Sequence, residues 1–219
     1  MKNKIVLLLF IIASILSLSY ISTLPKVHKV ETLNEVEVTE YKGEKLTPLS
    51  ETPALGIKGK PSVDITNYKL SVYGLVENPL NLTYKEVLSK YKRYEKVVKL
   101  NCVEGWSSKL LFEGVLIDDI LKDAKIKDEA NTIIFHCVDG YTTSLPLTYI
   151  RDEKILLAYK VNGIVLPKDY GFPFRVVAEA KYGYKWAKWV VGIEVSEDTN
   201  YKGYWESRGF SNEADIEHP

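Results

Sequence analysis

Short apolar segments that alternate with polar residues recur along most of this chain, and many of them end at a turn containing Gly, Asn or Asp. Alternation with a period of two is the pattern of a β-strand with one buried face. Strand-like segments occur at Tyr68–Val76, Lys96–Val103, Asn131–Val138, Ile155–Val161, Phe174–Glu179 and Trp189–Val195. So many short strands need a packed sheet core, which predicts an α+β fold with mostly β content and two or three short helices.

Two stretches carry helix signals. Thr83 and Glu86 have the spacing of a capping box, in which each side chain bonds to the other residue's backbone amide, so we expect a short helix to start there. From Gly114 to Lys125 the apolar residues recur at the spacing of an amphipathic helix. The chain has no internal repeat, so we expect these elements to belong to one domain.

Composition and missing motifs exclude several functional classes. The chain has 219 residues with 29 basic and 29 acidic side chains, so it lacks the positive field of a nucleic-acid-binding protein. Two cysteines are too few for a disulfide framework or a four-cysteine zinc site. The G-x-S-x-G, Walker and G-x-G-x-x-G motifs are absent, which argues against a hydrolase, an NTPase and a Rossmann enzyme.

An uncharged run follows Lys2 and Lys4 and extends from Ile5 to Pro25. As a helix it would reach about 31 Å, which is close to the thickness of a bilayer core. We therefore predict that residues 1–25 are a signal sequence or a membrane anchor, and we favour the anchor because no clear cleavage site follows. By the positive-inside rule the rest of the chain lies outside the cytoplasm, and it would be secreted if the segment were cleaved.

The next stretch, residues 26–55, is charged and contains scattered valines. Pro48 and Pro53 interrupt any strand there. We expect a tether of weak order that leads into a folded domain over residues 56–219.

Cys102 is the first candidate for chemistry, because it lies where a strand breaks into the polar segment L-N-C-V-E-G-W-S. An exposed thiol there can act, once deprotonated, as a nucleophile or as a ligand to a soft metal. It can equally be a structural cysteine, or form a disulfide with Cys137, which an extracytoplasmic location permits. Cys137 lies inside an apolar strand, where a small buried side chain is the default interpretation.

A basic cluster with interleaved aromatic residues is the second candidate. Its members are Arg175, Lys181, Lys185 and Lys188, accompanied by Tyr182, Tyr184, Trp186 and Trp189. Such a loop can hold a phosphate by charge and backbone amides while aromatic rings flank a ring system. The alternative is a solvated charged loop whose aromatic residues anchor it to the core.

The two candidates together resemble the sulfite oxidase family of molybdopterin-binding oxidoreductases. The resemblance rests on L-N-C-V-E-G-W-S, then G-F-P-F-R-V-V, then Y-G-Y-K-W-A-K-W-V, in that order, and it extends over about residues 57–215. This family includes the periplasmic methionine-sulfoxide reductase catalytic subunit. The resemblance implies the sulfite oxidase-like fold and a two-electron oxygen-atom transfer.

The resemblance also implies roles for individual residues. Cys102 takes the place of the molybdenum ligand, and Tyr201 falls on the place of an active-site tyrosine in a downstream Y-K-G motif. The residues that would bind the molybdopterin are Asp139, Tyr170, Arg175, Trp186, Ala187 and Lys188, with Arg175 on the cofactor phosphate. A thiolate suits a soft, high-valent metal. The expected metal is molybdenum, and tungsten is the alternative.

Departures from the family narrow the expected function. No arginine precedes Arg93, so the sulfite-binding arginine has no counterpart, and a sulfoxide-like substrate fits better than a sulfite-like one. The haem motif is absent, so we expect a separate electron-transfer partner. No dimerisation domain follows the Y-K-G-Y-W motif, so we expect a monomer. The competing hypothesis is a non-catalytic extracytoplasmic binding module on the same fold.

Overall fold

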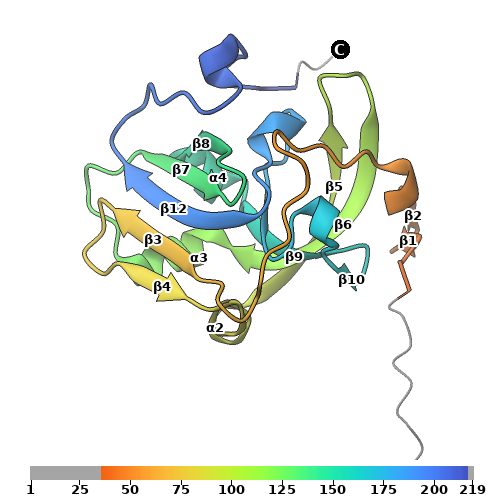
Figure 1. Ribbon diagram of the computed structural model, residues 1–219, viewed down its shortest axis with the longest axis horizontal. Helices are drawn as coiled ribbons and strands as arrows, with labels where there is room; N and C mark the ends of the chain where they lie inside the picture. The colour runs from red at the N-terminus through yellow and green to blue at the C-terminus, as the bar shows by residue number, and fades with distance from the viewer. Residues whose placement is uncertain (1–35, 217–219) are drawn as a thin grey trace, which may run out of the picture. The chain divides into compact units, whose positions relative to one another are not determined.

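The computed structural model describes residues 36–216, which belong to one compact unit (Figure 1). The strands are β1 (Glu40–Tyr41), β2 (Glu44–Lys45), β3 (Leu70–Gly74), β4 (Leu80–Leu82), β5 (Arg93–Asn101), β6 (Ser107–Leu116), β7 (Thr132–Cys137), β8 (Thr142–Pro146), β9 (Leu156–Val161), β10 (Ile164–Val165), β11 (Arg175–Val177) and β12 (Val190–Ser196). The α-helices among these residues are α2 (Tyr84–Lys90), α3 (Ile117–Ala124) and α4 (Leu147–Asp152). The predicted mostly-β content with a few short helices is confirmed.

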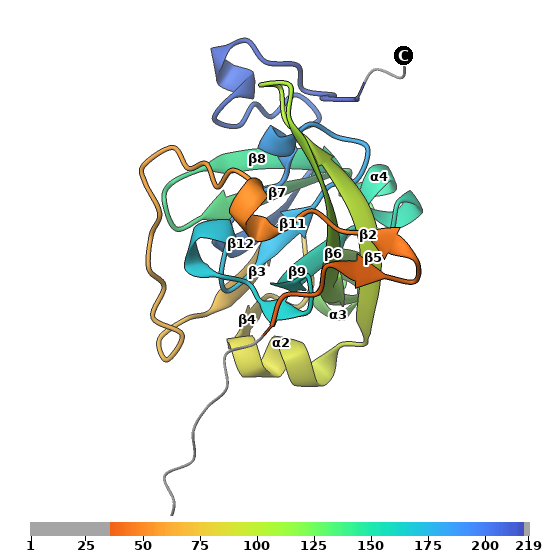
Figure 2. The ribbon, with the colours of Figure 1, turned by 90° about the vertical axis from the view of Figure 1, so that its right-hand side faces the viewer.

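Two five-stranded sheets carry the domain, with β1 and β2 as a separate hairpin. One sheet has the order β10-β9-β6-β5, and β11 also pairs with β9. All of its pairs are antiparallel, and the β5–β6 hairpin runs in register from Arg93↔Val115 to Asn101↔Ser107. Both ribbon views show the tip of this hairpin at the same end of the domain as the C-terminal segment (Figures 1 and 2).

The second sheet has the order β4-β3-β12-β7-β8. Its central strand β12 pairs parallel with β3 and antiparallel with β7. The β12–β7 ladder shifts register between Val190 and Gly192, directly after the basic aromatic segment. This irregular start of β12 is where the chain leaves the loops that carry Trp186, Lys188 and Trp189.

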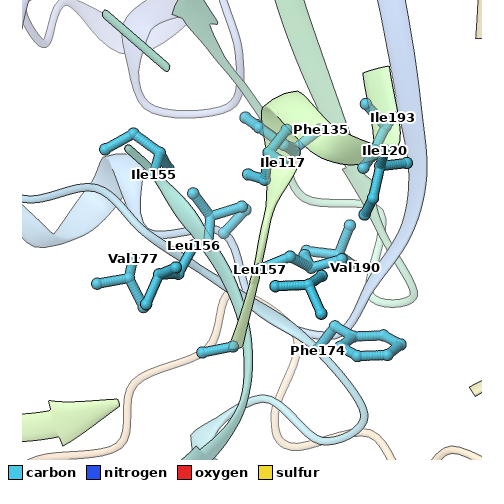
Figure 3. Packing of buried hydrophobic residues seen from close by; sticks show 14 of the residues in the cluster. Ile117, Ile120, Phe135, Ile155, Leu156, Leu157, Phe174, Val177, Val190 and Ile193 are labelled. Carbon is cyan, nitrogen blue, oxygen red and sulfur yellow. The ribbon is translucent and has the colours of Figure 1, made fainter. Parts of the chain in front are cut away.

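Residues from both sheets and from α3 pack into one buried core (Figure 3). Helix α3 buries Ile117, Ile120, Leu121 and Ala124, which is the apolar stripe expected of its sequence. It ends at Ala124, and the capping residue Lys125 has a positive φ of 52°. Figure 3 shows Ile117 and Ile120 of this helix together with Phe135 of β7 and Ile193 of β12.

One of the two predicted helices begins where its sequence signal lies, and the other begins later. The capping box at Thr83 and Glu86 is confirmed, since Thr83 caps α2 through both of its predicted hydrogen bonds. The helix predicted from Gly114 begins only at Ile117, because Gly114–Leu116 still belong to β6. A side chain at Gly114 would meet the backbone of Leu157 at 2.5 Å, so the close pairing of β6 with β9 requires glycine there.

The described part of the expected tether, residues 36–55, packs against the domain instead of forming a loose spacer. Leu46 and Leu49 are buried, and the Leu49 amide donates a hydrogen bond to Glu37. The hydroxyl of Tyr170 bonds to the carbonyls of Leu49 and Thr52, at 2.5 and 2.8 Å. Apolar side chains and carbonyls in this stretch thus find partners that a sequence pattern does not reveal.

Residues 1–35 and 217–219 lie outside the described residues. The predicted signal or anchor at residues 1–25 and the first part of the predicted tether fall there. Within residues 36–216 no helix is both long and apolar enough to cross a bilayer.

Candidate functional site

A cavity of about 370 Å³ is lined by six separate stretches of chain. They are the Thr52–Ile57 segment, the turn after β5, the loops around Asp139 and around Tyr170–Arg175, the Gly183–Trp189 loop, and the C-terminal residues Trp205 and Phe210. Most of the lining is apolar and aromatic, with few charged groups. Such a concave, mostly apolar site with a few polar groups is typical of a cofactor or substrate pocket.

Cys102 lies on this wall because strand β5 ends one residue earlier. The chain turns tightly there, with the Gly105 amide bonded to the Cys102 carbonyl at 3.1 Å and the Cys102 amide bonded to the Trp106 carbonyl at 2.9 Å. Gly105 has a φ of +91°, a conformation that glycine adopts without strain. The turn therefore places Cys102 in the lining of the cavity, where the residue is half-buried.

The surroundings of Cys102 do not favour a free thiolate. Burial raises the pKa of the Cys102 thiol, and the Glu104 carboxylate adds to this, while the backbone amides of Glu104 and Val103 act in the opposite direction with less effect. Reactive cysteines usually lie beside a cation that lowers their pKa. Backbone amides can donate to the Cys102 sulfur, but no cation is among the groups that shift its pKa. A bound metal ion would instead displace the thiol proton and stabilise the thiolate.

Arg175, the first residue of β11, reaches the same cavity with an unneutralised charge. Only 5% of the residue is exposed, and its guanidinium donates to the Tyr170 carbonyl at 3.2 Å. It lies over the rings of Phe112 and Trp186, at 5.3 and 5.8 Å from their centroids. Its Nε is buried and has no hydrogen-bond partner among the described residues. Burial lowers the pKa of the Arg175 guanidinium to about 10.

Lys188 lies beside Arg175, because the two residues form an isolated antiparallel bridge. Burial and the neighbouring Arg175 charge lower the pKa of the Lys188 ammonium to about 7. Its Nζ donates to the Leu55 carbonyl and lies 4.5 Å from the centroid of the Trp189 ring. Within residues 36–216 neither Arg175 nor Lys188 forms a salt bridge, so the wall carries two cations that an anionic group would satisfy.

The other two lysines of the basic cluster are paired within the protein. Lys185 is buried and bonds to Glu206 at 2.6 Å, and Lys181 pairs with Asp215. Two cations of the predicted phosphate-binding cluster, Lys181 and Lys185, therefore have counter-ions within the protein, whereas Arg175 and Lys188 have none among the described residues.

The structure brings most of the predicted site residues to this cavity. Cys102, Asp139, Tyr170, Arg175, Trp186 and Lys188 all line it. Ala187 is buried just behind the wall, where its carbonyl accepts a hydrogen bond from the Val176 amide. Tyr170 uses its hydroxyl to hold the Leu49–Thr52 turn, and Asp139 accepts a hydrogen bond from the Tyr141 amide.

Tyr201 is the predicted catalytic residue that the structure does not bring to the cavity wall. Its carbonyl accepts a hydrogen bond from Ser144, and its ring lies near enough to Tyr73 of strand β3 to raise the pKa of that phenol, after burial and Glu194. The geometry therefore does not support a contact between Tyr201 and the cavity.

Several lining residues were not predicted as part of the site. They include Thr52–Ile57, Tyr141, Tyr184, Trp205 and Phe210. Tyr184 belongs to the basic aromatic segment, and this segment is a sequence signal for it. Trp205, Phe210 and the Thr52–Ile57 segment reach the cavity only through long-range packing, and no local pattern marks them.

Comparison with known proteins decides the family. A family profile described as "Oxidoreductase molybdopterin binding domain" matches residues 57–205. The chain belongs to this family. It is therefore an enzyme, a molybdopterin-binding oxidoreductase, and the predicted sulfite oxidase-like family membership is confirmed.

Two of the relatives that resemble this molybdopterin-binding oxidoreductase are bacterial proteins. The uncharacterized oxidoreductase YuiH of Bacillus subtilis (strain 168) is 40% identical over 153 residues, which cover 69% of this chain and 76% of YuiH. YedZ1 of Azospira oryzae, provisionally named a protein-methionine-sulfoxide reductase subunit, is 31% identical over 149 residues, or 68% of this chain and 56% of YedZ1.

The sulfane dehydrogenase SoxCD from Paracoccus pantotrophus has the same fold, with a TM-score of 0.67 and 23% identity. The match covers 78% of this chain and 50% of that chain, so the present protein spans about half of this neighbour.

The residues of the cavity fit the cofactor of the family, molybdopterin with molybdenum. The pterin carries a phosphate, and the buried Nε of Arg175, which lacks a partner among the described residues, is a donor that such an anion would satisfy. Cys102, which is half-buried and lines the same cavity, carries a soft sulfur donor suited to molybdenum.

The alternative disulfide does not form, since Cys102 and Cys137 are both free. Cys137 is buried in β7, and burial raises the pKa of its thiol. The backbone amide of Lys188 lies against the sulfur of Cys137. Cys137 is thus a small buried side chain beneath the cationic part of the cavity.

Proposed function

We propose that this molybdopterin oxidoreductase reduces a small neutral sulfoxide to the corresponding thioether, with Cys102 as the molybdenum ligand. In this reaction the S=O bond breaks, and two electrons and two protons convert the oxygen to water. The bound cofactor supplies the two-electron chemistry, and a separate redox protein supplies the electrons. The same site can run the oxidation of a thioether in reverse when the partner accepts electrons.

One observation carries this proposal: Cys102 shares a single cavity with the two unpaired cations Arg175 and Lys188. A metal held at the sulfur and a phosphate held at the cations are the two ends of one chelating cofactor. Trp186 supports the Arg175 guanidinium by its ring, and Ala187 fixes the loop by its backbone contact with Val176. We assign Arg175 and Lys188 to the phosphate and Asp139 and Tyr170 to the rim of the pterin site.

A neutral substrate fits the side chains around Cys102. The turn carries Val103, Glu104 and Trp106, so the charge nearest the sulfur is a carboxylate. With Arg175 and Lys188 assigned to the cofactor phosphate, an anion such as sulfite would meet that carboxylate without a free compensating cation, whereas an uncharged sulfoxide would not be repelled. The relative YedZ1, which is named as a methionine-sulfoxide reductase subunit, supports the same substrate class.

Metal analysis of the natively produced protein tests the proposal. We expect about one molybdenum per chain, pterin fluorescence, and reduction of dimethyl sulfoxide by a reduced viologen dye. Cys102→Ala should lose the metal and the activity, while Cys137→Ala, a matched change at the other free cysteine, should keep both. Protein without metal and pterin, or a Cys102→Ala variant with full activity, would refute the assignment.

We also propose that residues 1–25 anchor the protein in a membrane and that the enzyme acts outside the cytoplasm as a monomer. The support is the run from Ile5 to Pro25 behind Lys2 and Lys4. Carbonate extraction of membranes should leave the full chain in the pellet. A protease added to spheroplasts or protoplasts should cleave the domain without lysis of the cells. Recovery in the cytosolic fraction would exclude this location.

A further inference from the structure

The C-terminal segment Tyr201–Ile216 contributes to the cavity although most of it lies beyond the family match, which ends at residue 205. We call this segment the C-terminal strap. Trp205 and Phe210 of the strap line the same cavity as Cys102. In both ribbon views the strap, drawn in dark blue, lies at the end of the domain that holds the β5–β6 tip (Figures 1 and 2).

The strap continues a row of aromatic rings that begins on the cavity wall. Phe210 lies 5.3 Å from Tyr184 and 5.1 Å from Trp205, measured between ring centroids. Trp205 lies 5.3 Å from Tyr204, which lies 5.8 Å from Tyr141. Phe210 is still 38% exposed, although it contacts two rings. An aromatic ring that lines a cavity and also faces solvent stands at the cavity mouth.

A buried ion pair fastens the strap directly beside these rings. Lys185 follows Tyr184, and Glu206 follows Trp205, so each partner is adjacent to a cavity-lining residue. The pair is 2.6 Å long, and the side chains of Lys185 and Glu206 are 1% and 0% exposed. Lys185 also donates to the side-chain oxygen of Asn212, at 3.2 Å, two residues after Phe210.

Further contacts hold the two partners of this ion pair. Lys185 donates to the Ser144 carbonyl at 3.1 Å, and Thr143 donates to the Glu206 carboxylate at 2.6 Å. The Tyr184 hydroxyl donates to the Ser211 carbonyl at 2.8 Å, on the far side of Phe210. Both flanks of Phe210 are therefore tied to the loop that carries Tyr184.

We propose that Phe210 and Trp205 form the substrate-selecting wall of the enzyme, and that the Lys185–Glu206 pair positions this wall. The inference rests on the proposed sulfoxide reduction and specifies its substrate: a neutral sulfoxide that carries an aromatic or bulky apolar group. Lys185 and Glu206 are positioning residues, since they are buried behind the wall and act through Trp205 and Phe210.

The chemistry of the wall explains this choice of substrate. Val103, Trp106, Tyr184, Trp205 and Phe210 carry no charge, and burial raises the pKa of the Tyr184 phenol to about 12, so it stays neutral at physiological pH. Rings arranged in this way accept another ring beside them by offset or edge contacts. An apolar substituent thus gains contacts that a methyl group does not make.

The first experiment compares methyl phenyl sulfoxide with dimethyl sulfoxide as substrates of the holoenzyme. In Phe210→Ala we expect the KM for methyl phenyl sulfoxide to rise about 10-fold, since one apolar group in a pocket discriminates to that extent. The KM for dimethyl sulfoxide should rise less, because its methyl groups make fewer contacts with the wall, and the molybdenum content should stay at the parent value. Tyr73→Ala is the matched control, because Tyr73 is also 38% exposed but does not line the cavity.

The second experiment tests the positioning role with Glu206→Gln, which removes the charge and keeps the shape. We expect the preference for methyl phenyl sulfoxide over dimethyl sulfoxide to fall as far as in Phe210→Ala, with metal content retained. Asp215→Asn is the control, since it removes the strap's exposed ion pair with Lys181. Asn212→Ala is a milder variant for the case that Glu206→Gln does not fold. An unchanged preference in both variants would overturn the positioning role.

A binding measurement separates failure of this inference from failure of the proposed reaction. Methyl phenyl sulfone has the same shape, and we use it as a dead-end ligand whose binding quenches tryptophan fluorescence. If the parent reduces no sulfoxide but binds the sulfone with an affinity that Phe210→Ala weakens about 10-fold, the wall stands and the reaction is wrong. If sulfoxides are reduced and Phe210→Ala changes neither KM nor sulfone binding, the wall is wrong.

Discussion

Lys185 and Lys188 lie three residues apart on one loop, but they have opposite electrostatic surroundings. Lys185 is buried against the Glu206 carboxylate, with further acceptors from Ser144 and Asn212. Lys188 has a carbonyl partner in Leu55 and the like charge of Arg175 beside it. Burial lowers the pKa of both ammonium groups, but Glu206 opposes this effect at Lys185 whereas Arg175 adds to it at Lys188.

This difference separates cations that stabilise the fold from cations that bind a ligand. A charge that another residue of the chain neutralises contributes as much to the stability of the apoprotein as to that of the holoenzyme. A charge left without a counter-ion opposes folding until an anion arrives, and its stabilising effect appears only on binding. Lys185 belongs to the first class, and Arg175 and Lys188 belong to the second.

The largest expected effect comes from Lys185→Met. This change leaves the Glu206 carboxylate buried without its cation, and breaking a buried pair in this way costs about 3–5 kcal/mol of unfolding free energy. Urea unfolding of apoprotein and holoenzyme should show a similar loss in both. Lys181→Met is the control, because its partner Asp215 is 65% exposed and the loss should stay below about 1 kcal/mol. A loss confined to the holoenzyme would place Lys185 with the ligand-binding cations.

The second largest effect is expected from Arg175→Met, which should weaken cofactor binding and stabilise the apoprotein. Removing the guanidinium takes away a charge-assisted contact to the cofactor, and we expect retention of the cofactor to weaken by about 100-fold. The apoprotein should become more stable by roughly 1 kcal/mol, because an unpaired buried charge is replaced by an apolar chain. Pterin content and thermal unfolding of apoprotein check the two parts. A destabilised apoprotein would show that Arg175 is structural.

The family resemblance assigns Arg175 and Lys188 to the cofactor, whereas the basic aromatic segment by itself does not distinguish them from Lys185. All three lie in one basic aromatic segment, and only the fold shows that Glu206 reaches Lys185 from the C-terminal strap. Cys102 was identifiable because its loop interrupts a clear strand pattern. The cavity-lining role of Phe210 and of the Thr52–Ile57 segment was not, since it depends on contacts between residues far apart in sequence. The missed strand Ser107–Leu116 merges with a helix, and their joint apolar spacing imitates one longer helix.

A change of pH is expected to have a smaller effect, on the affinity of the apoprotein for an anion. In the apoprotein the Lys188 ammonium has a pKa of about 7, so it loses its proton as the pH rises through neutrality. An anion favours the charged form, so binding takes up a proton and weakens with rising pH. We expect sulfate, which stays dianionic in this range, to bind the apoprotein about 10-fold more tightly at pH 6 than at pH 8.

Calorimetric titration of sulfate at the two pH values checks this prediction, and Lys188→Met should abolish the difference. Arg175, Asp139, Lys60 and Cys137 also act on the Lys188 charge, so Cys137→Ala is a useful second control. A pH dependence that survives in Lys188→Met would assign the titration to another group.

The smallest effect concerns the chain segment that covers Lys188. One hydroxyl proton of Tyr170 serves the carbonyls of Leu49 and Thr52, and Leu55 a few residues later accepts from Lys188. Tyr170→Phe should therefore cost about 1 kcal/mol, the net value of a hydrogen bond, and should act locally. Hydrogen exchange should quicken at residues 49–57 of the apoprotein and less in the holoenzyme, where a bound cofactor would support the Thr52–Ile57 segment from the cavity side. Equal acceleration in both forms would mean that the segment is fastened independently of the cofactor, as the Lys185–Glu206 pair is.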